Sequence, residues 1–247
     1  MRAPRKPFLR TIATLEERVD PTEFPFTLPL LKNGFRLDLT TMVTLLVGEN
    51  GSGKSTLLEA IAQQCRFNPE GGSKFTNFGT REETSPLARA LRLSWSTKVF
   101  DGFFLRAESF FNFASYLDRL NQEDARALLS YGGRSLHEQS HGDAFLALFN
   151  NRFEQGIYIL DEPEAALSPQ RQLAFLALVH QLEQSGMSQF LIATHSPILL
   201  AYAGATLFSL DGSSIQPIDY HDTDHYRITK SFLESPERYF RHLFSDE

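Results

Sequence analysis

The chain of 247 residues is poor in several features, and each shortage excludes a class of protein. It has a single cysteine, Cys65, so no internal disulfide can form, which is typical of proteins in a reducing cytoplasm. No stretch approaches the ~20 consecutive apolar residues that a membrane-spanning helix needs. The basic start of the chain is not followed by an apolar run of signal-peptide length. These shortages predict a soluble, cytoplasmic protein.

Positive charge is scarce as well. The 24 lysines and arginines are outnumbered by 30 aspartates and glutamates, so no overall attraction to nucleic acid is expected from the net charge of −6. A local basic groove would still be compatible with this balance. Phenylalanine, in contrast, is abundant, with 22 residues against seven tyrosines and one tryptophan. This richness favours an aromatic core, with a broad apolar packing surface as the alternative.

The order of sequence patterns predicts an α/β fold. Strands are expected at 8–15, 35–39, 43–47, 91–99, 102–107, 156–160 and 189–194, and closing segments at 197–202, 206–210 and 214–218. Helices are expected at 54–65, 108–120, 121–131, 143–153 and 168–186, and a loop or flexible insertion at 66–88. Because the buried strands lack polar alternation and are separated by helices, the central sheet should be mostly parallel and covered on both faces.

A glycine-rich turn, GENGSGKST, follows the buried strand at 43–47 and precedes a helical pattern. It fits the phosphate-binding motif G-x4-G-K-[ST], in which backbone N–H groups at a helix start surround an anion. Lys54 is expected to reach the β- and γ-phosphates, and the Ser55 hydroxyl to hold Mg²⁺. The predicted nucleotide-binding residues are Gly48, Glu49, Asn50, Gly51, Ser52, Gly53, Lys54, Ser55 and Thr56.

Two acids end the buried strand of GIYILDEPEAALSP. Asp161 and Glu162 should lie at the carboxyl edge of the sheet, beside the phosphate-binding turn. We expect Asp161 to bind Mg²⁺, and Glu162 to polarise an attacking water as general base. A P-loop kinase also needs the turn and Mg²⁺, but it would not usually place a second acid next to the metal ligand.

A histidine ends the next buried strand, in QFLIATHSPILLA. His195 should lie at the same sheet edge as the turn and the paired acids, where an imidazole can hydrogen-bond to the γ-phosphate. The alternative is a structural histidine. Lys54, Glu162 and His195 are therefore the predicted catalytic residues.

The turn, the DEP strand and the THS histidine, in this order and spacing, resemble the ATP-binding cassette (ABC) ATPase family. The resemblance implies ATP and Mg²⁺ as ligands. It also implies a P-loop core with an N-terminal antiparallel β subdomain and an inserted helical subdomain. The core is expected at 1–65 and 145–247, and the insertion at 66–144.

ABC ATPases carry an LSGGQ signature loop before the DEP strand, and it caps the γ-phosphate on the other subunit. In EQSHGDAFLALF, Ser140 stands 21 residues before the paired acids; Gly142 and Asp143 match the loop, while His141 replaces a glycine. The SHG[ED] form resembles small stand-alone ABC-type ATPases. The alternative is a simple N-capped helix start. A signature would imply a head-to-tail homodimer with two ATPs between the chains.

Other family features match less well. No glutamine corresponds to the glutamine loop, where Arg106 and Glu108 are the polar candidates; a plain helix start is the alternative. In the loop that touches the opposite subunit, Ser168 occupies the position where the family usually has an aspartate. Phe24 and Phe26 both stand at a suitable distance before the turn to stack on adenine, and either could equally belong to the core.

Two more stretches allow alternative interpretations. DYHDTDHY places His221 and His225 among acids, which suggests a metal site if the segment is helical, or else a solvated polar loop. The phenylalanine-rich stretch 100–117 is either a partner-docking surface or the insertion's own core.

The function expected is Mg²⁺-dependent ATP hydrolysis by a stand-alone homodimer. The alternatives are a slow ATP-gated switch that holds a protein or nucleic acid, and the ATPase subunit of a transporter, whose membrane partner is the less favoured.

Overall fold

The helices and strands follow the predicted order closely. The computed structural model describes residues 6–76, 84–124 and 126–244. Its strands are β1 (Leu9–Thr14), β2 (Arg36–Asp38), β3 (Val43–Val47), β4 (Leu91–Trp95), β5 (Gly102–Arg106), β6 (Gly156–Asp161), β7 (Ser188–Ala193), β8 (Ala205–Ser209) and β9 (Gln216–Pro217). Its α-helices are α1 (Lys54–Gln64), α2 (Pro86–Ala90), α3 (Phe110–Glu123), α4 (His141–Arg152), α5 (Pro169–Ser185), α6 (Pro197–Leu200), α7 (Asp224–Glu234) and α8 (Pro236–Leu243). Short 3₁₀ helices are η1 (Glu16–Arg18), η2 (Leu129–Tyr131), η3 (Leu136–Glu138), η4 (Pro163–Ala166) and η5 (Tyr220–Asp222).

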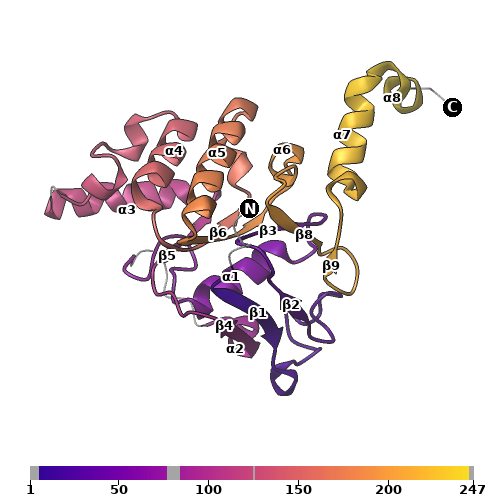
Figure 1. The fold of residues 1–247 in the computed structure, drawn as a ribbon, viewed down its shortest axis with the longest axis horizontal. Helices are drawn as coiled ribbons and strands as arrows, with labels where there is room; N and C mark the ends of the chain where they lie inside the picture. Colours follow the sequence, from indigo (N-terminus) through magenta and orange to yellow (C-terminus); the bar gives the residue numbers. More distant parts are fainter. Residues whose placement is uncertain (1–5, 77–83, 125, 245–247) are drawn as a thin grey trace.

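The central sheet has the strand order β5-β6-β7-β3-β8-β9, and every pairing in it is parallel except that of β8 with β9. All residues of β3, β6 and β7 are buried, as expected for strands covered on both faces. Helices α3, α4, α5 and α6 lie on one side of the sheet, and α1 lies on the other (Figure 1). The predicted α/β class with a mostly parallel sheet is confirmed.

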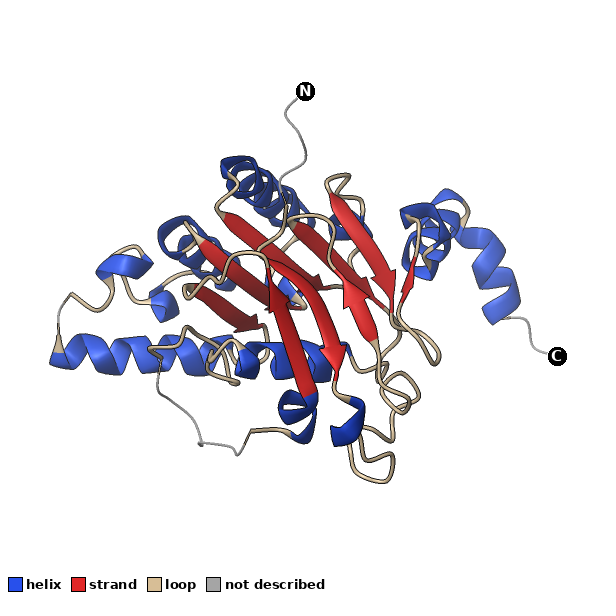
Figure 2. Cartoon of the chain, turned by 60° about the horizontal axis from the view of Figure 1, so that its bottom comes forward, coloured by secondary structure: helices blue, strands red, loops and turns tan. Residues whose placement is uncertain are grey.

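A separate antiparallel sheet, β2-β1-β4, covers α1 on the side away from the central sheet (Figure 2). One buried amide ties the two sheets together. Gln189 of β7 is fully buried; its Oε1 accepts the N–H of Leu9 at 2.8 Å and its Nε2 donates to the Leu9 carbonyl at 2.9 Å. Both backbone groups of Leu9, the first residue of the middle strand β1, are thereby satisfied inside the protein.

Alternate residues of the central strands face two different cores, because side chains alternate along a strand. Tyr158 and Leu160 face the core beneath α3, α4 and α5, whereas Ile157 and Ile159 face α1. The first core is rich in aromatic contacts, such as Phe103 with Phe113, Phe149 with Phe175 and Phe153 with Tyr158. The abundance of phenylalanine therefore builds a core, as favoured from the sequence.

The range predicted for the helical insertion, 66–144, also contains the two strands β4 and β5. Strand β4 joins the antiparallel sheet and β5 forms the edge of the central sheet, so both belong to the sheets and not to the insertion. The near-continuous apolar run of β5 explains this, since four of its five residues are buried. The insertion's helices begin at α3 and continue through α4. The expected helix at 121–131 is wrong: α3 ends at Glu123, and the 3₁₀ helix η2 follows.

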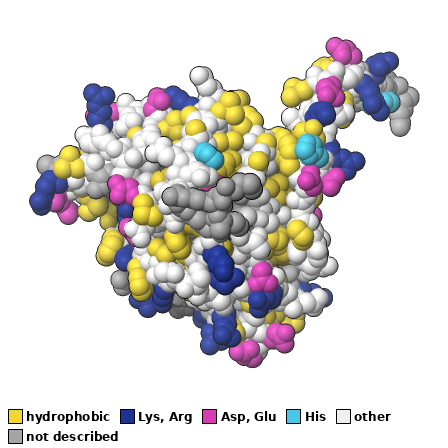
Figure 3. Space-filling model, viewed as in Figure 1, with side chains coloured by type: hydrophobic (Ala, Val, Ile, Leu, Met, Phe, Trp, Pro, Cys, Tyr) yellow, Lys and Arg dark blue, Asp and Glu magenta, His cyan; other side chains and the backbone are white. Residues whose placement is uncertain are grey.

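The C-terminal helices α7 and α8 form an arm that projects from the body beyond β9 (Figures 1 and 2). The arm carries exposed apolar side chains next to basic and acidic ones (Figure 3), namely those of Ile228, Leu233, Phe240, Leu243 and Phe244. Within the residues that the structure describes, no helix combines the length and the hydropathy needed to cross a membrane.

Candidate functional site

The glycine-rich turn joins β3 to α1, as predicted. Gly51 and Gly53 have φ angles of 83° and 97°, a left-handed conformation that favours glycine. A Cβ on Gly53 would also lie 3.3 Å from a methyl group of Leu28. The start of the turn is held by the segment that follows the neighbouring strand β8, because the N–H of Glu49 donates to the Asp211 carboxylate at 2.7 Å.

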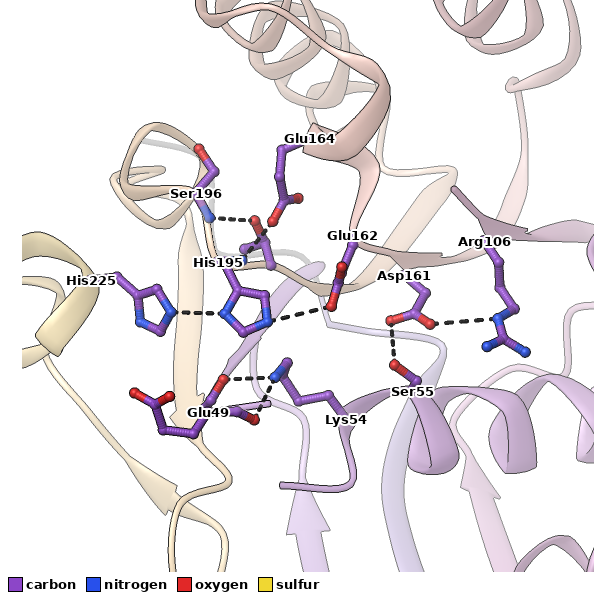
Figure 4. A network of polar contacts seen from close by, with 12 residues as sticks. Glu49, Lys54, Ser55, Arg106, Asp161, Glu162, Glu164, His195, Ser196 and His225 are labelled. Atoms are coloured by element: carbon purple, nitrogen blue, oxygen red, sulfur yellow. Dashed lines mark hydrogen bonds and ion pairs between the residues drawn. The ribbon is translucent and has the colours of Figure 1, made fainter. Parts of the chain in front are cut away.

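Lys54 closes the turn from the inside. Its side chain is only 4% exposed, and its Nζ donates to the carbonyls of Gly48 at 2.6 Å and Glu49 at 3.0 Å (Figure 4). Burial lowers the pKa of this ammonium, while Glu162 and Asp161 oppose that shift. The ammonium is therefore held within the turn, where the motif would present it to phosphate oxygens.

Ser55 and Asp161 meet at the end of β6. The Ser55 hydroxyl donates to Asp161 Oδ1 at 3.2 Å, and both residues line a cavity of about 200 Å³. Burial raises the pKa of Asp161 to about 6, against the hydrogen bond from Ser55 and the charge of Arg106. A hydroxyl and a buried carboxylate fit Mg²⁺, which takes few protein ligands and completes its shell with water and phosphate oxygens. No cluster of three or more histidine, cysteine or acidic side chains that could hold a metal occurs in the described ranges.

Glu162 occupies an unusual backbone conformation beside the same cavity. Its φ and ψ angles are both 52°, which is rare for a non-glycine residue and is often found at functional sites. Its N–H donates to the Ala193 carbonyl at 3.0 Å, so the neighbouring strand β7 holds the turn in place. The carboxylate points toward His195, with Oε1 3.4 Å from Nε2 of that ring (Figure 4).

His195 is held on two sides. Its backbone N–H donates to Glu164 Oε1 at 2.6 Å, and its ring Nδ1 lies 2.8 Å from Nε2 of His225. Its Nε2 is buried and, despite the nearby Glu162 carboxylate, makes no well-aligned hydrogen bond in the described structure. Burial first, and then the charge of Lys54, lower the pKa of His195 and favour the neutral ring. A buried polar atom without a partner at this edge is the feature expected of a group that meets a ligand.

The predicted signature residues form the start of α4. The Ser140 Oγ accepts the N–H of Asp143 at 3.3 Å and its hydroxyl donates to the Asp143 carboxylate, so the N-capped start is confirmed. Asp143 pairs with Arg171 at 2.5 Å, and a Cβ on Gly142 would lie 2.5 Å from a guanidinium nitrogen of Arg171. A side chain at position 142 would force the Arg171 guanidinium to move. The side chain of His141 lies outside the described part of the structure.

Among the described residues, this signature segment makes no hydrogen bond or ion pair with the phosphate-binding turn of its own chain. Helix α4 packs against α5 and the short helices η2, η3 and η4, while the Ser140 hydroxyl is engaged with Asp143. Ser168, the predicted contact residue for a second subunit, lies exposed at the start of α5 and makes no side-chain cap there.

Arg106 and Glu108 both line the cavity that contains Ser55 and Asp161. Arg106 lies 3.3 Å from Glu59, 3.4 Å from Glu108 and 3.7 Å from Asp161. The Glu108 side chain is 87% exposed, so it is free to turn toward a ligand in the cavity. Both candidates for the place of the glutamine loop therefore lie at the cavity that contains Ser55 and Asp161.

The two candidate adenine-stacking residues have different surroundings. Phe26 is 1% exposed and belongs to the core around α1, which is the core alternative that the sequence left open for it. Phe24 is 64% exposed. It lies four residues before Leu28, the side chain that touches the turn at Gly53, and remains the stacking candidate.

The histidines of DYHDTDHY do not form the suggested metal site. His221 lies in η5 and hydrogen-bonds to Asp219, whereas His225 lies in α7 and contacts His195. They do not share a helix face. The favoured polar loop is also only partly right, because His225 is half-buried.

Sequence reasoning did not single out three polar side chains that support the site. Glu164 accepts the His195 N–H, and Arg171 holds the start of α4. Gln172 is buried; it donates to the Leu167 carbonyl at 3.0 Å and accepts the Ser196 hydroxyl. Glu164 lies three residues after Asp161, and Arg171 and Gln172 lie in the first turn of the helix that follows, so the segment after the DEP strand was the place to look for them.

Comparisons with known proteins agree with this geometry. One family model, described as "AAA domain", matches residues 26–85, and another, described as "AAA domain, putative AbiEii toxin, Type IV TA system", matches residues 135–201. The tungstate uptake system ATP-binding protein TupC of Campylobacter jejuni is 24% identical over 237 residues, covering 84% of this chain and 69% of that protein.

Two solved structures share the fold. A nucleotide-free ATP-binding cassette from an ABC transporter matches with a TM-score of 0.52 and 16% identity, covering 94% of this chain and 98% of that one. The cbiO1 protein of Clostridium perfringens, part of the ABC transporter complex cbiONQ, matches with a TM-score of 0.50 and 17% identity, covering 93% and 97%. At such low identity, the likeness establishes the fold, and function must come from the site.

The chain thus has a P-loop fold like that of ABC ATPases, with the phosphate-binding turn and the acids of β6 at one edge of its central sheet.

Proposed function

We propose that the chain hydrolyses ATP to ADP and phosphate in the presence of Mg²⁺, as a stand-alone homodimer with two ATPs between the subunits. One observation carries the hydrolytic part of the proposal. Lys54, the Ser55–Asp161 pair, Glu162 and His195 come from three separate segments and meet at one edge of the central sheet (Figure 4). A cation, a site for a metal, a base and a hydrogen-bond donor are the groups that phosphoryl transfer to water requires.

Each group has a role that its surroundings support. The Lys54 ammonium would leave the turn's carbonyls for the β- and γ-phosphates, and the Glu162 carboxylate would take a proton from the attacking water. His195 would donate to the γ-phosphate from the buried Nε2 that has no well-aligned partner. Mg²⁺, held by Ser55 and Asp161, would neutralise charge that develops on the phosphate oxygens.

The pairing of two chains is supported by the position of the signature segment. In the part of the chain that the structure describes, Ser140 and Gly142 are ordered by Asp143 and Arg171 and have no hydrogen bond to the phosphate-binding turn of the same chain. An N-capped helix start suits a phosphate, because its N–H groups and dipole attract negative charge. A second copy would bring this segment to the nucleotide and complete the site, with the exposed Ser168 in the contact.

A mixing experiment tests the pairing directly. Lys54→Ala removes the phosphate-binding lysine and Ser140→Ala removes the signature hydroxyl, so each variant alone should release little phosphate from ATP. Mixed together they should recover roughly a quarter of the wild-type rate, because half of randomly paired dimers are mixed and each has one complete site. The Ser140→Ala chain loses a helix cap of about 1 kcal/mol, which a thermal melt would register.

The outcomes separate the parts of the proposal. Normal phosphate release by Lys54→Ala would refute the hydrolytic site. Inactive single variants that fail to complement, while wild-type protein is active, would refute the shared site. Tight ATP binding with negligible release by wild type would select the slow, ATP-gated switch.

A transporter subunit is the second candidate, because the relative in C. jejuni is the ATP-binding protein of an uptake system and both solved structures come from ABC transporters. The burial of the stretch at 100–117 argues against the docking of a membrane partner there. Four of its six phenylalanines are buried in the cores, and only Phe100 and Phe111 are exposed. Co-purification of a tagged chain with an integral membrane protein from solubilised membranes would favour this candidate.

A further inference from the structure

The contact between His195 and His225 assigns a role to the C-terminal arm. His225 is the second residue of α7, and its Nε2 lies 2.8 Å from His195 Nδ1, with the rings 5.0 Å apart and tilted by 47° (Figure 4). These residues are 30 positions apart in the chain. No residue other than His225 meets Nδ1 of His195 in the hydrogen bonds of the described residues.

The position of His225 is held by its own surroundings. Thr223 caps α7; it is buried, its Oγ1 accepts the Tyr226 N–H at 3.3 Å and its hydroxyl donates to the Tyr220 carbonyl at 2.7 Å. Tyr220 and Tyr226 also pack ring to ring at 4.6 Å. The first turn of α7 is therefore fixed on the body of the protein, and it holds His225 beside the end of β7.

The position of the proton in the His195–His225 hydrogen bond decides whether His195 presents a donor or an acceptor to a ligand. Neutral imidazole carries one N–H, so a hydrogen bond at Nδ1 determines the state of Nε2. If His225 donates from its Nε2, His195 accepts at Nδ1 and must carry its own proton on Nε2. That nitrogen is the buried atom next to Glu162 that faces the expected phosphate position. In the opposite tautomer Nε2 would present a lone pair to a phosphate oxygen, which is repulsive.

We propose that His225 is a positioning residue that fixes His195 in the Nε2–H tautomer and aims this donor at the γ-phosphate. The proposal rests on the ATPase function proposed above. It also makes the arm part of the catalytic site, because α7 delivers the group that orients the phosphate-sensing ring. Displacement of α7 by a partner would then slow hydrolysis without touching the nucleotide.

The test uses two substitutions at this position and one control. His225→Phe keeps a flat ring but removes the donor, whereas His225→Gln retains a terminal N–H that can reach Nδ1. His221→Phe is the matched control, since it makes the same change four residues earlier on an exposed ring that bonds to Asp219. The first readout is the ¹⁵N NMR spectrum of histidine rings in nucleotide-free protein, which distinguishes protonated from unprotonated ring nitrogens; the His195 signals are identified by their loss in His195→Gln. The second readout is steady-state phosphate release.

We expect wild type, His221→Phe and His225→Gln to show His195 protonated at Nε2. In His225→Phe the two tautomers should mix, and kcat should fall by about 10- to 100-fold with KM little changed, the range known when the outer partner of a ligand histidine is removed. An unchanged His195 spectrum in His225→Phe, or equal losses in His225→Phe and His225→Gln, would overturn the proposal. If wild type has no ATPase activity at all, the proposed function fails, yet the spectrum still decides the tautomer.

Discussion

Replacing Glu162 by glutamine should stop hydrolysis while leaving the site assembled. The structure explains why the change is local. The backbone of residue 162 is held by its N–H bond to Ala193 at 3.0 Å, and glutamine has the same shape as glutamate. The amide oxygen can keep the place of Oε1, 3.4 Å from His195. Only the negative charge and the ability to accept a proton are lost.

The expected size of the effect follows from the role. Removing a general base typically costs a factor of about 10² to 10⁴ in rate, which corresponds to about 2.7–5.4 kcal/mol in the activation free energy. The Glu162 side chain is 42% exposed, so folding stability should change by less than about 1 kcal/mol. ATP affinity should stay close to that of wild type, since Lys54, Ser55 and Asp161 are untouched.

Three measurements check these numbers on the same protein. Single-turnover phosphate release gives the chemical step, equilibrium binding of a fluorescent ATP analogue gives affinity, and light scattering after gel filtration with ATP and Mg²⁺ gives the oligomeric state. We expect slow release, normal binding and a dimer that persists with ATP. Glu154→Gln, the same change at the opposite end of β6, is the control and should behave as wild type. A Glu162→Gln protein that hydrolyses ATP normally would refute the assignment of the base, and one that stays monomeric with bound ATP would refute the trapped dimer.

Two further predictions concern the support of the site. Gln189→Leu should lower the free energy of unfolding by about 2–4 kcal/mol in urea titrations, because it leaves the N–H and carbonyl of Leu9 buried without partners; an unchanged midpoint would contradict the bridge between the sheets. Phe24→Ala should weaken ATP binding with little change in stability, whereas Phe26→Ala should cost about 3–5 kcal/mol of stability. If Phe24→Ala binds ATP like wild type, the base stacks elsewhere.

The sequence predicted well where the chemistry is local. The strand–turn–helix at Lys54 and the acids after β6 were placed correctly, because a phosphate-binding turn is made of consecutive residues and a buried parallel strand has a recognisable apolar run. His195 was placed at the same edge for the same reason. The helix start at Ser140 was likewise visible from its cap.

Sequence reasoning was weaker where packing decides. Both Phe24 and Phe26 were suitable by spacing, but one is 64% exposed and the other 1%, since only the fold determines which residue of a turn faces inward. The helix expected at 121–131 is not present: α3 ends at Glu123, because helical propensity alone does not maintain a helix beyond its packed face. Strands β4 and β5 joined the sheets rather than the insertion, because strand pairing joins segments that are distant in the chain.

The sequence by itself determined which groups this protein has for binding a triphosphate. The backbone geometry of a glycine turn and of the end of a strand is encoded within a few neighbouring residues. The tertiary structure alone decided how those groups are supported. Arg171 reaches Asp143 across 28 residues and His225 reaches His195 across 30, and no local pattern specifies either contact. Such contacts depend on how helices pack on the sheet, which is a property of the whole chain.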